Sequence, residues 1–210
     1  MQKLLRIVML TAAALLPAGT AWSQVSTAAP DTMVRDLTTE VLDAIRADQS
    51  IAGGDLSRVQ KLVDEKILPY VDFQKMTQLA VGRGWRSATP EQRTALTREF
   101  RTLLVRTYSG ALSQVKDHKV QMKPFRAQPN DADVVVRTSV VPSRGEPIQL
   151  DYRLEKLESG WKIYDVNVLG VWLVENYKTQ FAGEINAGGV DGLIKSLTDR
   201  NRQLAEAKKA

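Results

Sequence analysis

The stretch that decides the fold runs from Val134 to Val168 and reads VVVRTSVVPSRGEPIQLDYRLEKLESGWKIYDVNV. Side chains of two kinds alternate along residues 134–141 and again along residues 148–155, and every second residue belongs to the more apolar kind. This alternation is typical of half-buried strands. The loop 142–147 separates these runs, and Ser159-Gly160 turns into a further strand, 161–168. With residues 120–125 as the first strand, we predict a four-stranded antiparallel meander, apolar on one face.

Helical spacing of apolar side chains flanks this sheet on both sides, over about residues 30–115 and again over 171–204. The longest helix starts at Thr89-Pro90-Glu91-Gln92, which has the pattern of a capping box. Gly188-Gly189 should break the last helix. Candidate N-cap residues of the earlier helices are Asp31, Asp55 and Asp72.

We therefore predict an α+β fold in which helices cover a curved four-stranded antiparallel sheet. Residues 24–210 form one domain, with its core at about 30–204. A strongly curved sheet with helices across its concave side encloses space, and the sequence leaves open whether that space is filled or hollow.

The N-terminus has the pattern of a secretory signal peptide, residues 1–23. Lys3 and Arg6 precede ten uncharged residues, and cleavage after Ala21 or after Ser23 fits the small residues that follow. Ten residues are too few for a helix to cross a hydrocarbon layer of about 30 Å, which disfavours a membrane anchor. We expect export to a bacterial periplasm.

The composition excludes several kinds of chemistry. The chain has 210 residues, no cysteine and one histidine, His118. Disulfides, thiolate metal sites, cysteine nucleophiles and multi-histidine sites are therefore excluded. Without residues 1–23 the net charge falls from +5 to +3, too small an excess for a dedicated nucleic-acid-binding protein. We expect no metal ion, no cofactor and no catalytic residue.

Aromatic side chains are concentrated near the end of the sheet and in the helix that follows it. Trp161, Tyr164, Trp172, Tyr177 and Phe181 lie within one short segment. A packed core explains this concentration, and an apolar cavity for a hydrophobic ligand is the functional alternative.

Two stretches resemble the family of periplasmic phospholipid-binding MlaC proteins, also described as toluene-tolerance auxiliary components of an ABC transporter. They are residues 81–93, VGRGWRSATPEQR, and residues 160–178, GWKIYDVNVLGVWLVENYK, followed by Phe181 and by Asp191-Gly192-Leu193-Ile194. The resemblance is collinear over about residues 30–201. The chain departs from the family pattern at Leu169, Trp172 and Lys178, where an acidic residue, serine and arginine are usual.

The resemblance implies a fold like the nuclear-transport-factor-two-like cone, with extra helices and an apolar cavity. It also implies a soluble shuttle for diacyl phospholipid, and we expect this shuttle to be a monomer. Its partners would be an outer-membrane lipoprotein–porin complex and an inner-membrane ABC transporter with a substrate-binding subunit, and its role would be to maintain outer-membrane lipid asymmetry.

Under this reading, inward-facing positions of strands and helices should contact the lipid, although ordinary core packing is an equal alternative for each of them. These positions are Phe73, Met76, Phe100, Leu104, Tyr108, Val136, Leu150, Tyr152, Ile163, Val171, Trp172 and Tyr177. Arg83, Arg86 and Lys178 are candidates for contact with a phosphate head group or an acidic partner.

Two other classes of function stay open. One is an adaptor of an ABC transporter with a filled interior and no lipid. The other is an enzyme that uses buried carboxylates on an apolar substrate, which the scarcity of histidine disfavours.

Overall fold

The computed structural model describes residues 28–112, 117–128 and 130–207. The predicted signal peptide, 1–23, and its cleavage sites lie outside these ranges. The helices are α1 (Pro30–Ala47), α2 (Gln49–Ala52), α3 (Leu56–Leu62), the π-helical turn η1 (Val63–Ile67), the 3₁₀ turn η2 (Leu68–Tyr70), α4 (Phe73–Val81), α5 (Arg83–Ser87), α6 (Pro90–Leu112) and α7 (Leu173–Ala207). The strands are β1 (Lys119–Met122), β2 (Asp133–Val141), β3 (Ile148–Leu157), β4 (Gly160–Val168) and β5 (Val171–Trp172).

The sheet is an antiparallel meander of five strands in the order β1-β2-β3-β4-β5, so the prediction of four was wrong in number. The fifth strand forms because Leu169 and Gly170 both have positive φ, 52° and 91°. That is the backbone of a tight two-residue hairpin, and it folds Val171 and Trp172 back onto β4. The helical spacing that begins at Val171 hid this short strand from the sequence.

The helix starts follow the capping signals in the sequence, with one exception. Asp55 and Asp72 each accept hydrogen bonds from backbone amides of the following turn. The backbone amide of Gln92 donates to the hydroxyl oxygen of Thr89, and the backbone amide of Thr89 donates to the side-chain oxygen of Gln92. These two hydrogen bonds form the predicted capping box. Asp31 is not an N-cap, because α1 already begins at Pro30 with Ala29 in the capping position.

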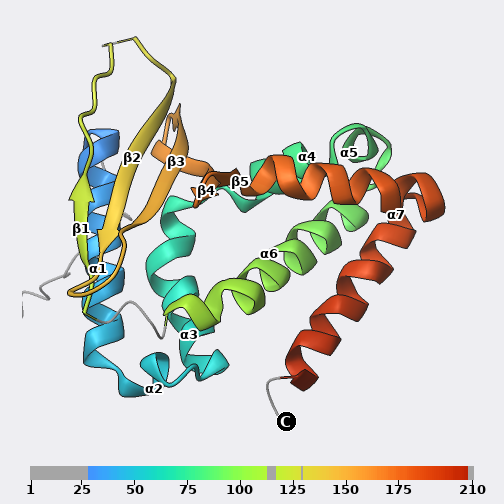
Figure 1. Cartoon of the computed structure of the whole chain (residues 1–210). Coiled ribbons are helices and arrows are strands. Elements are labelled where there is room, and N and C mark those ends of the chain that lie inside the picture. Colours follow the sequence, from blue (N-terminus) through green and yellow to red (C-terminus); the bar gives the residue numbers. More distant parts are fainter. Residues whose placement is uncertain (1–27, 113–116, 129, 208–210) are drawn as a thin grey trace, which may run out of the picture.

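Helix α1 covers one part of the apolar face of the sheet. Its Met33, Val34 and Leu37 pack with sheet residues to form a buried cluster, and α1 lies along the sheet in Figure 1. The sheet residues of this cluster are Val134, Val136, Leu154 and Ile163.

A second core lies between α4, α6 and α7, at the other end of the molecule (Figure 1). Its centre is three aromatic rings: Phe100 lies edge-on to Tyr177 and to Phe181, with ring centroids 4.9 and 5.1 Å apart. Helix α7 bends at Gly189, whose φ of 67° and ψ of −166° are accessible essentially to glycine alone. The predicted break at Gly188-Gly189 is thereby confirmed, and the arm after it folds back along α6.

Candidate functional site

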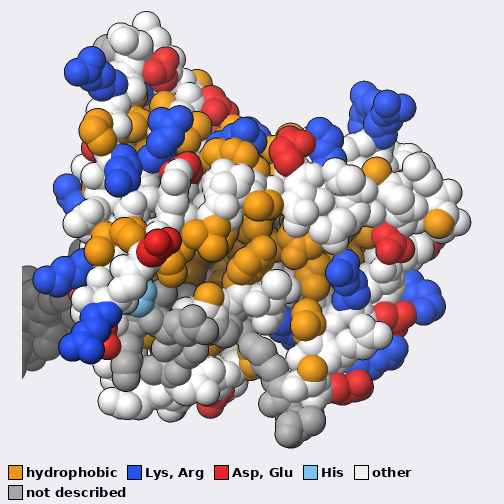
Figure 2. All heavy atoms as spheres, viewed as in Figure 1, with side chains coloured by type: hydrophobic (Ala, Val, Ile, Leu, Met, Phe, Trp, Pro, Cys, Tyr) orange, Lys and Arg blue, Asp and Glu red, His pale blue; other side chains and the backbone are white. Residues whose placement is uncertain are grey.

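An apolar, hollowed surface lies between the sheet and helices α6 and α7. Figure 2 shows hydrophobic side chains gathered there across the middle of one face of the molecule. Val166 packs against both buried clusters, the one under α1 and the one around α6 and α7, so it lies where they meet. The neighbouring Tyr152, Val168 and Tyr108 are also apolar and only partly buried.

Strand register shows which side chains share this apolar face, because residues directly opposite each other point to the same side. One row across the sheet is Met122, Thr138, Leu150, Val168 and Val171. The next row is Val136, Tyr152 and Val166. The hydroxyl of Thr138 donates to the carbonyl of Leu150 at 2.9 Å, so the row presents no unpaired donor.

An irregularity in the pairing of β3 with β4 decides which residues of β4 face this surface. Leu154 pairs with Ile163 and Arg153 pairs with Asp165, so Tyr164 is an extra residue on β4. Ile163 and Val166 consequently lie on the same face although they are three residues apart. The predicted lining included Ile163 but missed Val166 and Val168, because a strict period of two from Ile163 places both on the opposite face.

The opposite face of the sheet carries a polar network. Trp172 pairs with Asn167 and therefore lies on this face, away from Leu150 and Tyr152. The prediction that all three line one apolar surface needs correction for Trp172. Its ring is covered by the guanidinium of Arg153, 4.1 Å from the ring centroid.

The centre of this network is the fully buried carboxylate of Asp165. It accepts a 3.0 Å hydrogen bond from the backbone amide of Val174 in the first turn of α7, and Arg153 lies 3.2 Å away. Burial raises the pKa of Asp165, while hydrogen bonds from the amides of Val174 and Val166 and the charge of Arg153 oppose that rise. Asp165 thus joins the sheet to α7 at an electrostatic cost.

Tyrosines on the sheet and on helices α6 and α7 have raised pKa values, so their side chains stay neutral. Burial raises the pKa of Tyr152, of Tyr108 and of Tyr177 above the usual value of a tyrosine. On the polar face, burial and the carboxylate of Asp133 raise the pKa of Tyr164, whose hydroxyl donates to Asp133 at 2.7 Å. These phenols contribute apolar area and hydrogen bonds rather than charge.

The predicted lipid-contact residues fall into three groups by exposure. The buried ones are Met76, Phe100, Leu104, Val136, Ile163 and Tyr177. The partly buried ones are Phe73, Tyr108, Leu150, Tyr152 and Trp172. Val171 is 50% exposed at the edge of the sheet. The buried group packs within the two cores, whereas Leu150 and Tyr152 expose part of their surface on the apolar face of the sheet.

The three predicted cationic contacts are all exposed. Arg83 and Arg86 lie on α5 and form no ion pair within the described residues. Lys178 lies on α7, with its ammonium 3.8 Å from the carboxylate of Glu175. Such a surface pair contributes little to stability.

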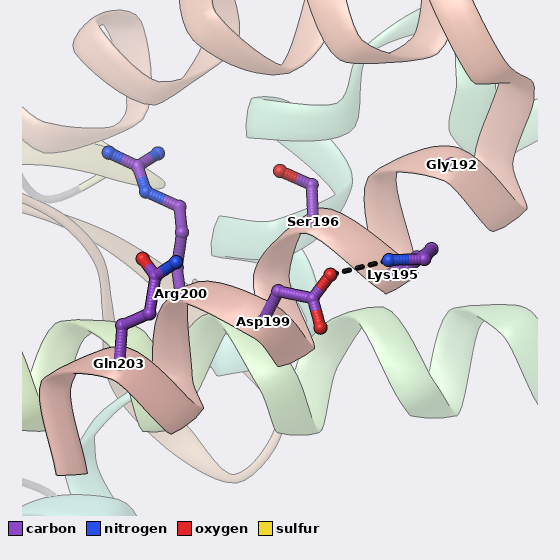
Figure 3. A pocket seen from close by; sticks show the side chains of 6 residues that line it. All are labelled: Gly192, Lys195, Ser196, Asp199, Arg200 and Gln203. Carbon is purple, nitrogen blue, oxygen red and sulfur yellow. Dashed lines mark hydrogen bonds and ion pairs between the residues drawn. The ribbon is translucent and has the colours of Figure 1, made fainter. Parts of the chain in front are cut away.

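A small polar hollow of about 330 Å³ lies along the second arm of α7 (Figure 3). Its lining is Gly192, Lys195, Ser196, Asp199, Arg200 and Gln203. Lys195 is paired with Asp199 at 2.6 Å, and the lining carries no large apolar side chain. This hollow is unsuited to an acyl chain. None of the helices in the described part of the chain is long and apolar enough to cross a membrane.

The family model described as MlaC protein matches residues 35–199. The chain belongs to the MlaC family. The match spans both motifs, residues 81–93 and 160–178, the whole sheet, and most of α1 and α7.

Among MlaC-family relatives, the intermembrane phospholipid transport system binding protein MlaC of Haemophilus influenzae is 26% identical over 171 residues, 80% of each chain. Toluene tolerance protein ttg2D of Pseudomonas putida is 25% identical over 182 residues, 86% of this chain and 84% of the relative. A solved phospholipid-binding protein from Ralstonia solanacearum, in complex with a phospholipid, is 49% identical with a TM-score of 0.82. It matches over 85% of this chain and 99% of its own.

Proposed function

We propose that this protein carries diacyl phospholipid through the periplasm, between an outer-membrane lipoprotein–porin complex and an inner-membrane ABC transporter, and thereby maintains outer-membrane lipid asymmetry. The observation that carries this proposal is the match to the Ralstonia solanacearum protein, which is 49% identical over nearly its whole length and holds a phospholipid. The apolar surface between sheet and helices is where this chain offers a comparable environment. No reaction is required for the role.

The solvation of acyl chains explains why a carrier is needed. Each methylene transferred out of water gains about 0.8 kcal/mol, so a lipid with roughly 30 methylenes would cost on the order of 24 kcal/mol to hold free in water. Spontaneous transfer across an aqueous gap is therefore negligible. An apolar protein surface offsets most of that cost, and partner proteins then need to shift only a small remaining difference.

We propose that the acyl chains contact the apolar face of the sheet, over the rows that contain Leu150, Tyr152, Val166 and Val168. Tyr108 of α6 is placed to contact the chains from the helical side. The buried residues among the predicted contacts, such as Phe100 and Tyr177, would join only if the helices separate from the sheet. This arrangement is the proposed nuclear-transport-factor-two-like cone, with its opening toward solvent for the head group.

Mass spectrometry tests the proposal directly. The full-length chain is expressed in a Gram-negative host with export to the periplasm, and the mature protein is purified without detergent. Native spectra should show a mass increase equal to whole phospholipids, and solvent extraction should identify them. Protein that is empty, and that also takes up no phospholipid from vesicles, would refute the carrier role and favour a transporter adaptor with a filled interior.

A further inference from the structure

A second, larger groove lies behind helix α6, on the side away from the aromatic core. It has a volume of about 850 Å³. Leu96, Phe100 and Leu103 of α6 are buried in the core, whereas Thr97 and Arg101 of the same helix line the groove. Helix α6 also supplies Pro90, Arg93, Thr94, Arg98 and Thr102, and the rest of the lining comes from α3, η1, η2, α4 and α5. The groove is therefore separated from the apolar face of the sheet by α6 itself.

The groove combines an apolar floor with cationic walls. The partly buried Leu68 and Phe73 supply most of the apolar area, since Trp85 is only 5% exposed. Arg93 lies over Trp85, with its guanidinium carbon 5.5 Å from the ring centroid, and donates to the carbonyl of Trp85 at 3.1 Å. Arg98 extends from the next turn of α6. An aromatic floor beside fixed guanidinium groups suits a ligand that has both apolar and anionic groups.

The charges along the groove are unbalanced toward the positive. Its lining contains Arg93, Arg98 and Arg101 but only one acidic residue, Asp64, which is already paired with Arg101. Arg93 has no acidic partner within the described residues. Arg98 pairs with the adjacent Glu99 at 3.0 Å but is largely exposed. Arg83 and Arg86 are exposed and lie on α5, the same short helix as Trp85.

The groove also accounts for the sequence stretch 81–93, which the apolar surface leaves without a role. Gly82, which has a positive φ of 61°, is the N-cap residue of α5. A Cβ at Gly84 would lie 2.9 Å from the Cδ1 of Ile185, so glycine lets α5 pack closely on α7. Trp85 is thereby placed at the floor of the groove, opposite Arg93.

We propose that this groove docks an acidic segment of a protein partner, one that carries an apolar side chain among its carboxylates. The proposal rests on the carrier function, because a carrier must dock on the complexes that load and unload it. A membrane surface fits the geometry less well, since a flat bilayer reaches the rim of a concave groove but not a floor formed by the partly buried Leu68 and Phe73. Charge complementarity selects acidic rather than basic segments.

The test uses a defined peptide as the probe. It is about 15 residues long, roughly 22 Å as a helix, with one tryptophan and one leucine among glutamates on one face. A matched peptide has glutamine at every glutamate position. Fluorescence anisotropy at low salt should show the acidic peptide binding about tenfold more tightly than the neutral one, and added salt should remove the difference.

Variants locate the binding to the groove. Arg98→Glu should weaken binding of the acidic peptide about tenfold, because it replaces an attraction with a repulsion. Arg144→Glu makes the same charge change on the exposed hairpin between β2 and β3 and should leave the affinity unchanged. Equal affinities for the two peptides, or equal losses in the two variants, would overturn the proposal.

Three further measurements distinguish a peptide-binding groove from the alternatives. Binding of phosphatidylglycerol vesicles that Arg98→Glu abolishes, without preference between the peptides, would assign the groove to a membrane instead. Dimers in sedimentation that the same variant dissociates would assign it to a second copy. Extraction of lipid from the same preparations keeps the two proposals separate. Lipid-loaded protein without peptide preference overturns only the docking site, and empty protein that prefers the acidic peptide overturns only the carrier role.

Discussion

Arg153 and Trp172 are stacked on the outer face of the sheet, with the guanidinium carbon 4.1 Å from the ring centroid. The same guanidinium lies 3.2 Å from Asp165, which has no exposed surface. Arg153 on β3 therefore contacts both Trp172 of the two-residue strand β5 and the carboxylate of Asp165, which accepts a hydrogen bond from the first turn of α7.

Replacing Arg153 with leucine should lower the free energy of unfolding by about 2 kcal/mol, because a buried carboxylate loses its counter-charge. Urea denaturation followed by circular dichroism measures this change. Arg137→Leu is the matched control, since Arg137 is exposed on β2 and lies on the same face. Equal effects of the two substitutions would show that the network around Asp165 has no special stabilising role.

The raised pKa of Asp165 predicts a definite pH dependence. The folded state binds the proton more tightly than the unfolded state, so Asp165 favours folding most below its unfolded pKa of about 3.9. This advantage is lost as pH rises through the raised pKa of the folded state. Asp165→Asn resembles the protonated form and should therefore become more stable relative to the wild type as pH increases. Urea titrations from about pH 3.5 to pH 7 check the sign. The opposite trend would mean that Arg153 and the helix amides outweigh burial.

Val168→Asp should reduce the phospholipid that co-purifies with the protein by about tenfold, because it places a charge on the apolar face beside Leu150. Lipid extraction and mass spectrometry give the stoichiometry, and circular dichroism shows whether the variant is folded. Leu157→Asp introduces the same charge at an exposed end of β3 and should keep its lipid. A folded Val168→Asp protein with full lipid occupancy would remove Val168 from the proposed site.

Adjacent glycines in α7 should respond differently to alanine. Gly189→Ala should cost about 1–3 kcal/mol of stability, since its positive φ is strained for any residue with a Cβ. Gly188→Ala should be neutral or stabilise by up to about 1 kcal/mol, because it has a helical backbone and no atom within 4 Å of an added Cβ. Thermal denaturation of the pair measures the difference. Equal melting temperatures would show that the bend tolerates a side chain.

Features set by neighbours along the chain could be predicted from the sequence. The side chains of Asp55, Asp72 and Thr89 cap helices because each is followed directly by the amides it bonds. Glycine at 189 bends α7 because its backbone requirement is local. The alternation in β2 and β3 likewise identified the apolar face, since side-chain direction in a regular strand depends only on position.

The tertiary structure alone decided what depends on pairing between distant segments. The extra residue Tyr164 arises from the register of β3 against β4, and it moves Val166 and Val168 onto the apolar face. The positive φ of Leu169 and Gly170 folds Trp172 back beside Asn167, on the face away from the proposed lipid contacts. Periodicity along one strand cannot report these shifts, because a bulge or a turn changes side-chain direction through hydrogen bonds to a different strand.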